Sequence, residues 1–390
     1  MDSPALRPPA SSPARETAIP SGRTTVLVGL SGGVDSAVAA LLLKERGHDV
    51  IGVTMAIYDG PPGDAPARHA CYDCGEREEI ELAREAARRI GIPHHVLDCA
   101  RQYRRIVLAY FRREYLAGLT PNPCVRCNHL VKFGVLPAAA SKSGLRFDLF
   151  ATGHYARTGF SETYGRHVLR QGVDTPKDQS YFLYRLDQRQ LGRTILPLGE
   201  MTKAEVRDIA RRAGLPMADQ PESQDFYSGD RADILEVRDT PGRIVDTAGR
   251  QLGTHSGFWR FTPGQRRGLG IAASEPLYVL RVDAARNEVV VGTWAESHRP
   301  SCRVGNLRFI VPLEEIETPL RARLRSSQLP VAVSDVLQDI AAGELEVAFA
   351  EPQQGMAPGQ SLVLYAGDMV VGGGVILPER AQAGLTPPEN

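Results

Sequence analysis

A six-residue segment, Ser-Gly-Gly-Val-Asp-Ser at 31–36, lies between the apolar run 25–28 and an apolar-striped helix pattern over 37–45. Two glycines without Cβ atoms let consecutive backbone N–H groups converge on an anion at the helix N-terminus. The helix dipole is favourable there as well. The order of strand, glycine turn and helix therefore predicts a phosphate-binding cradle.

The cradle lacks the lysine that a Walker P-loop places after its last glycine, and Asp35 stands there instead. Because a bare carboxylate repels phosphate, we expect either that Mg²⁺ bridges the two or that Asp35 caps the helix. Such a cradle suits a departing pyrophosphate better than γ-phosphoryl transfer. The alternative is an ordinary turn with a helix cap, and the matching flanks on both sides weigh against it.

The first half of the chain alternates strand-like and helix-like segments. Strands separated by helices of this length predict an α/β fold with a doubly wound parallel sheet and sites at the strand C-termini. Further strands are expected over 50–54, 94–97 and 149–152, and helices over 76–90, 101–117 and 132–143. A last helix is expected from Thr202, with Glu205 completing a capping box and Gly214 ending it.

The second half is rich in Pro and Gly and has short alternating segments at 288–291, 345–349 and 362–365. This pattern predicts antiparallel β structure, with a small barrel at the C-terminus.

Bulk composition restricts the class of protein. A chain of 390 residues exceeds one typical core, so two or three domains are expected. The formal net charge is zero, which leaves nucleic-acid contact to local patches. Six cysteines, several in Cys-x-x-Cys pairs, indicate a reducing compartment, and no apolar stretch is long enough for a bilayer. We therefore expect a cytoplasmic protein without membrane contact.

The cradle resembles the SGGxDS signature of the PP-loop ATP pyrophosphatases, enzymes that adenylate a substrate and release pyrophosphate. With the motifs that follow, the chain from Thr24 to Leu377 resembles the bacterial tRNA-specific 2-thiouridylases of the MnmA type. No single motif is specific, but the combination is. These motifs occupy 120–128, 132–134, 151–156, 177–183, 264–270 and 358–360.

The resemblance implies that ATP, with Mg²⁺, adenylates O2 of the wobble uridine of tRNA, and that persulfide sulfur then displaces AMP. The implied partners are tRNA and a sulfur-donor protein or persulfide carrier. Composition and the change of punctuation along the chain give the boundaries, and the resemblance gives the domain roles. We expect a disordered tail (1–22), a PP-loop catalytic domain (23–215), a central tRNA-binding domain (216–300), a C-terminal β-barrel (301–378) and a second tail (379–390).

Residue roles follow from the same resemblance. The nucleotide is assigned to Gly29, Leu30, Ser31, Gly32, Gly33, Val34, Asp35, Ser36, Met55 and Gly153. Contact with tRNA is assigned to Asn122, Pro123, Cys124, Lys177, Asp178, Gln179, Arg323 and Leu324. At the last pair the family usually has Arg-Tyr, so this chain lacks a stacking aromatic there.

The sulfur chemistry departs from the family pattern. Cys127 matches the family's nucleophile, but Cys124 stands where aspartate is usual, and Tyr227 occupies the place of the second cysteine, the persulfide carrier. Tyrosine can neither carry a sulfane sulfur nor resolve a persulfide. Either Cys124 takes the second role, or Cys124, Cys127 and one of Cys71 and Cys74 hold a [4Fe-4S] cluster with one open iron.

Structural zinc is a third possibility, although roughly fifty residues separate the two Cys-x-x-Cys pairs, against about 15 to 20 in zinc ribbons. The isolated Cys99 and Cys302 are expected to be buried small residues.

Several basic segments are further candidates for RNA contact, each with a solvated surface as the alternative. His154 is expected either to orient nucleotide or base, or to be satisfied at a strand end. The basic candidates are Arg101, Arg104, Arg105, Arg112 and Arg113 on one helix, Trp259-Arg260-Phe261 with Arg266 and Arg267, and Arg321, Arg323 and Arg325.

Two other function classes remain open. An amide-synthetase-like PP-loop enzyme would need an ammonia source, which the chain does not show, and would not need Cys124 and Cys127. A catalytically silent metal- and RNA-binding homologue is allowed by Tyr227, but the intact cradle with Asp35 weighs against it.

Overall fold

The computed structural model describes residues 15–16, 22–60, 70–72, 74–220, 226–227 and 229–379. The expected tails at 1–22 and 379–390 lie almost wholly outside these described residues, as do most of the residues 223–228 around Tyr227.

Five parallel strands form the sheet of the first half, in the order β4-β3-β2-β5-β8, which confirms the predicted doubly wound sheet. Alternation along β2 divides the core: Val26 and Val28 pack with helices α1, α2 and α8, whereas Leu27 packs with the residues of α3 to α6. The strands are β2 (Thr25–Gly29), β3 (Asp49–Ala56), β4 (His94–Asp98), β5 (Leu149–Ala151) and β8 (Thr194–Ile195).

Helix ends in this half follow the sequence signals. Helix α2 ends before Gly91, which adopts φ 74°, and α8 begins after Thr202, whose side chain forms the expected capping box with Glu205. The helices are α1 (Val34–Glu45), α2 (Glu76–Ile90), α3 (Ala100–Tyr103), η1 (Arg104–Leu108), α4 (Ala109–Leu116), α7 (Gln188–Leu191) and α8 (Lys203–Arg212).

The cysteine motif lies in a helix that begins earlier than the predicted 132. Segments α5 (Pro123–Arg126), η2 (Cys127–Val135) and α6 (Leu136–Lys142) run on without a break. Asn122 caps the first turn, because its Oδ1 accepts a hydrogen bond from Val125 N at 3.1 Å, and Pro123 suits the first helical position. Cys124 and Cys127 therefore lie one helical turn apart.

The C-terminal barrel is confirmed as six antiparallel strands that close through the β17–β18 pair. The hairpin β6–β7 of the first half, with β1 beside it, extends this sheet through the β7–β18 pair. The strands are β1 (Arg15–Glu16), β6 (Ala156–Ser161), β7 (Arg166–Gln171), β13 (His298–Phe309), β14 (Leu320–Arg323), β15 (Val331–Asp339), β16 (Glu344–Gln354), β17 (Ser361–Ala366) and β18 (Met369–Ile376).

A four-stranded sheet in the order β10-β9-β12-β11 forms the central region. It differs from the all-antiparallel expectation, because β9 and β12 run parallel. The elements of the central region are α9 (Arg231–Leu235), β9 (Gly242–Val245), β10 (Gln251–His255), β11 (Tyr278–Asp283) and β12 (Glu288–Gly292).

Elsewhere along the chain and within this region, the short helical turns η3 to η7 lie at Thr175–Lys177, Ser180–Leu183, Phe258–Arg260, Ala295–Ser297 and Leu313–Glu315.

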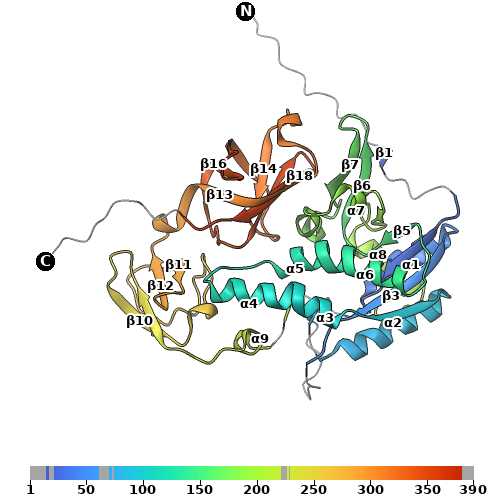
Figure 1. The fold of residues 1–390 in the computed structure, drawn as a ribbon, viewed down its shortest axis with the longest axis horizontal. Coiled ribbons are helices and arrows are strands. Elements are labelled where there is room, and N and C mark those ends of the chain that lie inside the picture. The colour runs from blue at the N-terminus through green and yellow to red at the C-terminus, as the bar shows by residue number, and fades with distance from the viewer. Residues whose placement is uncertain are drawn as a thin grey trace, which may run out of the picture.

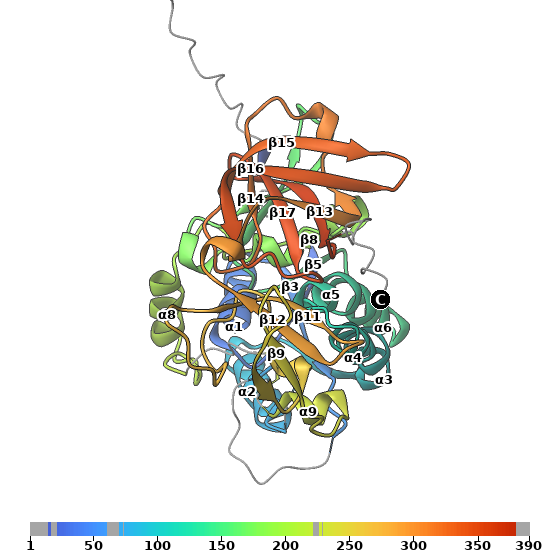
Figure 2. The ribbon, with the colours of Figure 1, turned by 90° about the vertical axis from the view of Figure 1, so that its left-hand side faces the viewer.

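Helices α4 to α6 cross the middle of the molecule, with the barrel above them, the parallel sheet at one end and the central sheet at the other (Figure 1). In the perpendicular view the barrel again lies over the helical layer (Figure 2). No helix within the described residues is long and apolar enough to span a membrane.

The barrel touches the start of the cysteine helix directly. Thr120 N donates to Pro358 O at 2.7 Å, and the Asn122 and Gln360 side-chain amides meet at 3.3 Å. Gly359 lies between these contacts with φ +94°, and a Cβ there would come within 2.9 Å of Thr120 N. The Pro358–Gln360 motif therefore packs closely against the 120–122 segment.

Substituting Gly359 tests this close packing. We expect Gly359→Ala to destabilise the protein by about 1–3 kcal/mol more than Gly343→Ala, because only the first forces a side chain into neighbouring backbone. Gly343 is the matched control, since it has φ +64° with no atom near its would-be Cβ. Urea denaturation of both variants measures the difference, and equal losses would contradict the close packing.

Candidate active site

The phosphate cradle is built from tightly packed backbone. Gly32 has φ +81°, and a Cβ there would collide with the carbonyl of Glu79. The Ser36 hydroxyl accepts from Ser31 N at 3.1 Å and donates to Gly33 O at 3.0 Å, which holds the turn closed. Gly153 follows β5, and a Cβ on it would lie 2.6 Å from Ser36 N. The glycines at 32 and 153 are thus required by close approach.

The residues assigned to nucleotide lie together at the carboxyl edge of the parallel sheet. Leu30 N donates to Val53 O at 2.8 Å, and the Thr54 hydroxyl donates to Leu30 O at 2.8 Å, so the cradle is fixed to β3 near Met55. This edge is where doubly wound proteins bind ligands.

Asp35 does not cap helix α1, whose start at Gly33 has no side-chain cap. Its carboxylate instead binds Lys203 Nζ at 2.8 and 2.9 Å and accepts from the Tyr155 hydroxyl at 2.8 Å. Lys203 is the first residue of α8 and is 9% exposed. A lysine distant in sequence therefore brings a cation to the cradle, which sequence analysis missed, because only the fold joins the two segments.

Mg²⁺ fits this arrangement in its donor chemistry. Mg²⁺ in nucleotide sites is commonly held by one or two carboxylates together with substrate phosphates, and Asp35 is such a carboxylate beside the cradle.

The candidate sulfur site lies where the helix that carries Cys124 and Cys127 starts. Burial raises the pKa of Cys127 to about 12, the Lys132 ammonium opposes that shift, and Cys71 and Cys99 add to it. Cys127 itself is partly exposed. The resting thiol is therefore protonated, and Lys132 is the cation that favours its thiolate. Lys132 was part of a recognised motif, but sequence analysis gave it no role.

Lys132 also connects the sulfur site to the nucleotide edge. Burial, and next the Lys132 charge, hold the pKa of His154 well below 6.5. The His154 ring lies 5.9 Å from that of Phe133, the neighbour of Lys132, and its Nδ1 lies 2.7 Å from the Thr152 hydroxyl. His154 is thus a buried, neutral ring whose Nδ1 has a hydrogen-bond partner, and it lies between the nucleotide edge and the cysteine helix.

Three cysteines influence the pKa of Tyr103. Burial raises the pKa of Tyr103 well above its ordinary value, and Cys127, Cys71 and Cys124 raise it further. All six cysteines are outside disulfides, and Cys99 and Cys302 are buried as expected. In the part of the chain that the structure describes, no three His, Cys, Asp or Glu side chains are arranged to hold a metal ion. Neither the cluster nor the zinc alternative has a formed site there.

The residues assigned to tRNA divide into two groups. Asn122, Pro123 and Cys124 are partly exposed at the helix start, as is Lys177. Asp178, Arg323 and Leu324 are buried, and Asp178 forms an ion pair with Arg323. In this conformation these three cannot touch RNA, and the ion pair instead fastens the barrel to the catalytic domain. Gln179 accepts from Tyr155 N at 3.0 Å, which makes it a support of the cradle.

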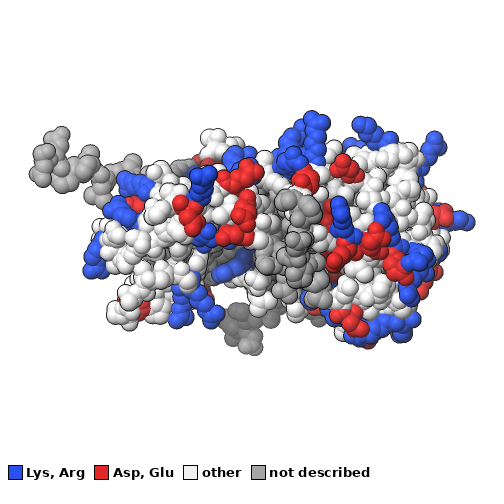
Figure 3. All heavy atoms as spheres, turned by 90° about the horizontal axis from the view of Figure 1, so that it is seen from below, with Lys and Arg blue, Asp and Glu red and all other residues white. Residues whose placement is uncertain are grey.

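Several of the other basic candidates pair with acidic side chains. Arg104 pairs with Asp59, Arg112 with Glu236, and Arg260 with Asp230 and Asp239. Trp259 and Phe261 are buried, whereas Arg266 and Arg267 are exposed beside a cavity of about 420 Å³ lined by residues of 266–277. Positive and negative side chains are interspersed on the face shown in Figure 3.

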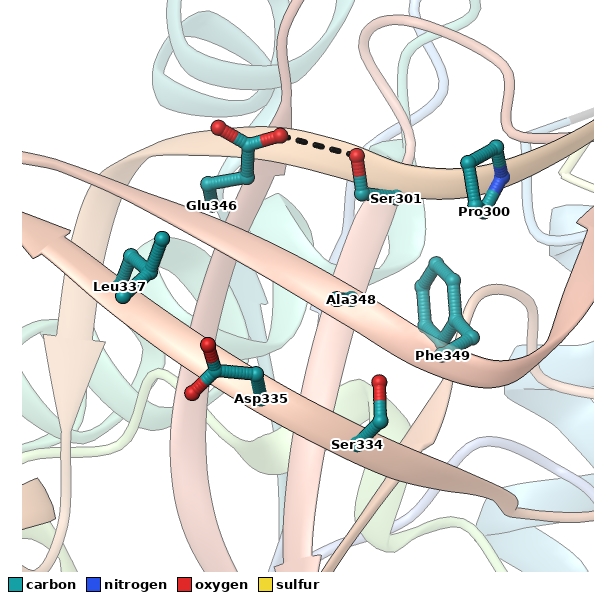
Figure 4. Close-up of a pocket in the computed structure, with 8 residues that line it drawn as sticks. All are labelled: Pro300, Ser301, Ser334, Asp335, Leu337, Glu346, Ala348 and Phe349. Carbon is teal, nitrogen blue, oxygen red and sulfur yellow. Dashed lines mark hydrogen bonds between the residues drawn. The ribbon is translucent and has the colours of Figure 1, made fainter.

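A second cavity, of about 310 Å³, lies on the barrel and shares no residue with the cradle or the sulfur site. Figure 4 shows Ser301 bonded to Glu346 at 2.9 Å across one side of it, opposite Asp335 and Leu337 of β15. It has none of the nucleophilic or phosphate-binding features of the site above.

Three family descriptions match successive parts of the chain: "tRNA methyl transferase HUP domain" over 24–227, "tRNA methyl transferase PRC-barrel domain" over 233–293 and "Aminomethyltransferase beta-barrel domain" over 299–376. A solved structure titled "Crystal structure of a 4-thiouridine synthetase - RNA complex with bound ATP" is 16% identical, with a TM-score of 0.32, and the match covers 55% of this chain and 49% of that one.

Two curated relatives are similar over nearly their whole length. The tRNA-specific 2-thiouridylase MnmA of Endomicrobium trichonymphae is 46% identical, covering 90% of this chain and 98% of the relative. That of Geobacter metallireducens is 44% identical, covering 91% and 97%. Fold and site thus define a PP-loop enzyme joined to two β domains. Within that class, the chain belongs to the tRNA-specific 2-thiouridylase family.

The pKa of Cys127 makes its reactivity depend on pH. Because the thiolate is the reactive form and the pKa is about 12, alkylation of Cys127 by iodoacetamide should keep rising from about pH 7 to about pH 10 without a plateau. Lys132→Ala should slow it further, whereas Lys142→Ala, on the next helical segment, should not. Peptide-resolved mass spectrometry measures both rates, and a plateau below about pH 9 would contradict the assignment.

Proposed function

We propose that this tRNA-uridine 2-sulfurtransferase activates O2 of the wobble uridine with ATP at the cradle and transfers sulfur through Cys127. The observation that carries the proposal is that one helix connects the phosphate cradle with the cysteine pair. The cradle with Asp35 and Lys203 lies at the sheet edge, and Cys124 and Cys127 lie on the helix whose Phe133 contacts His154 of that edge.

Adenylation requires phosphate charge to be stabilised as pyrophosphate leaves. The cradle N–H groups and the Lys203 ammonium supply positive potential, and the Tyr155 hydroxyl keeps Asp35 in place. Bound Mg²⁺, held by Asp35, would neutralise further phosphate charge. Neutral His154 is available to orient the base or nucleotide without adding charge.

Sulfur transfer then needs two thiols. The terminal sulfur of a Cys127 persulfide attacks C2 of the adenylated base, AMP leaves, and the base is joined to Cys127 through a disulfide. Cys124, one helical turn away, attacks the Cys127 sulfur and releases 2-thiouridine, leaving a Cys124–Cys127 disulfide. An external thiol reductant restores both thiols. Cys124 thus supplies the second thiol that Tyr227 cannot provide, while Cys127 itself carries the persulfide.

The cluster alternative would take its ligands from Cys124, Cys127 and one of Cys71 and Cys74. The described arrangement does not form such a site, and the mechanism proposed above includes no step at a cluster. For RNA binding, we propose Asn122, Pro123, Cys124 and Lys177 near the target base and the exposed pair Arg266 and Arg267 on phosphate.

Pyrophosphate release tests the activation step. We expect Asp35→Asn to lower tRNA-dependent pyrophosphate release by orders of magnitude with nearly unchanged tRNA affinity, because the change removes a charge at the cradle and leaves the RNA surface intact. Asp148→Asn, at the opposite end of the parallel sheet, is the control. Normal release by the Asp35 variant would remove Asp35 from the mechanism, and release independent of tRNA would contradict RNA as the substrate.

Thiol substitutions test the transfer step. With a persulfide donor, Cys127→Ser and Cys124→Asp should both form no 2-thiouridine while still releasing pyrophosphate, because neither leaves a resolvable thiol pair. Mass spectrometry of digested tRNA measures the product. Active wild-type protein purified without oxygen should be free of iron, whereas about four irons per chain, lost in Cys124→Asp, would favour the cluster instead.

A further inference from the structure

Cys71 is the most exposed thiol near the sulfur site, and neither the family pattern nor the proposed transfer step uses it. It is exposed, whereas Cys127 is only partly so. A thiol that receives sulfur from another protein must be reachable by that protein's own persulfide, because exchange requires direct attack of sulfur on sulfur.

The fold places Cys71 beside the position of the missing family cysteine. Tyr72 N donates to Phe226 O at 3.1 Å, so the Cys71–Tyr72 segment runs next to Phe226–Tyr227. Tyr227 is partly buried against the same core as Tyr72. The chain thus lacks a cysteine at 227 but has one, Cys71, on the segment that contacts this position.

The same segment leads to Cys127. The Tyr72 ring stacks on the Tyr103 ring at 5.6 Å, with 13° between the planes. Tyr103 ends α3, which packs against η2, and η2 begins at Cys127. The influence of Cys71 on the pKa of both Cys127 and Tyr103 agrees with this proximity. Cys74 is less exposed and influences Tyr227 instead.

We propose that Cys71 is the acceptor thiol that takes sulfane sulfur from a protein persulfide and passes it to Cys127. This inference rests on the proposed function and adds the route by which sulfur arrives. The Cys127 thiolate attacks the terminal sulfur of the Cys71 persulfide. The bond between that sulfur and the Cys71 sulfur breaks, Cys127 gains the persulfide, and Cys71 leaves as a thiolate. The exchange needs neither oxidant nor reductant, and the proton lost by Cys127 returns to Cys71.

Two donors separate this route from the transfer step. A cysteine desulfurase with L-cysteine supplies a protein-bound persulfide, and glutathione persulfide supplies a small one that can reach a partly buried thiol directly. We expect Cys71→Ser to lose about tenfold or more of the 2-thiouridine rate with the desulfurase and to keep the wild-type rate with glutathione persulfide. Cys127→Ser should lose the rate with both donors.

Cys74→Ser is the matched control and should behave as wild type with either donor. Unchanged pyrophosphate release by Cys71→Ser shows that the variant is folded. In Cys127→Ser, sulfur from the desulfurase should accumulate on Cys71, detected as an alkylated persulfide peptide. A full rate for Cys71→Ser with the desulfurase, a loss with both donors, or a label on Cys74 instead would overturn the route. Failure of wild type with both donors would count against the proposed function itself.

Discussion

The contact between Asn122 and the barrel is the constraint on which the sulfur site depends. Asn122 caps the helix that carries Cys124 and Cys127, and its amide group is held by Gln360. The Gln360 amide also lies 3.4 Å from Pro121 O, and Thr120 N is bonded to Pro358 O. The start of the helix that carries both cysteines is thus fixed by residues more than two hundred positions away. A barrel that moved on binding RNA would move the thiols with it.

The barrel is fastened to the catalytic domain by a second set of buried polar contacts. The Asp178–Arg323 ion pair is almost fully removed from solvent, and the Tyr181 hydroxyl donates to Ser361 O at 2.8 Å. Breaking one member of a buried pair leaves an uncompensated charge, which commonly costs about 3–5 kcal/mol. These residues therefore hold the barrel against the first half of the chain.

Local signals predicted the elements well. The glycine cradle, the Gly91 end of α2 and the Thr202 capping box each depend on neighbouring residues, so short sequence windows contained them. The Asn-Pro at 122–123 was also a readable start signal for the cysteine helix, but the expected helix began at 132. Residues that meet only in the fold were out of reach. Lys203 binds Asp35 across 168 positions of sequence. Neither the sequence of β9 nor that of β12 indicates that these two strands pair in parallel.

The central claim is that O2 of the target uridine leaves as part of AMP after adenylation at the cradle. The most direct measurement uses tRNA carrying a heavy oxygen isotope at O2 of the wobble uridine, in a single turnover with ATP and a persulfide donor. The account predicts that the isotope appears in the phosphate of AMP, in equal amount to the 2-thiouridine formed. Isotope found in inorganic phosphate or water, with AMP unlabelled, would contradict it.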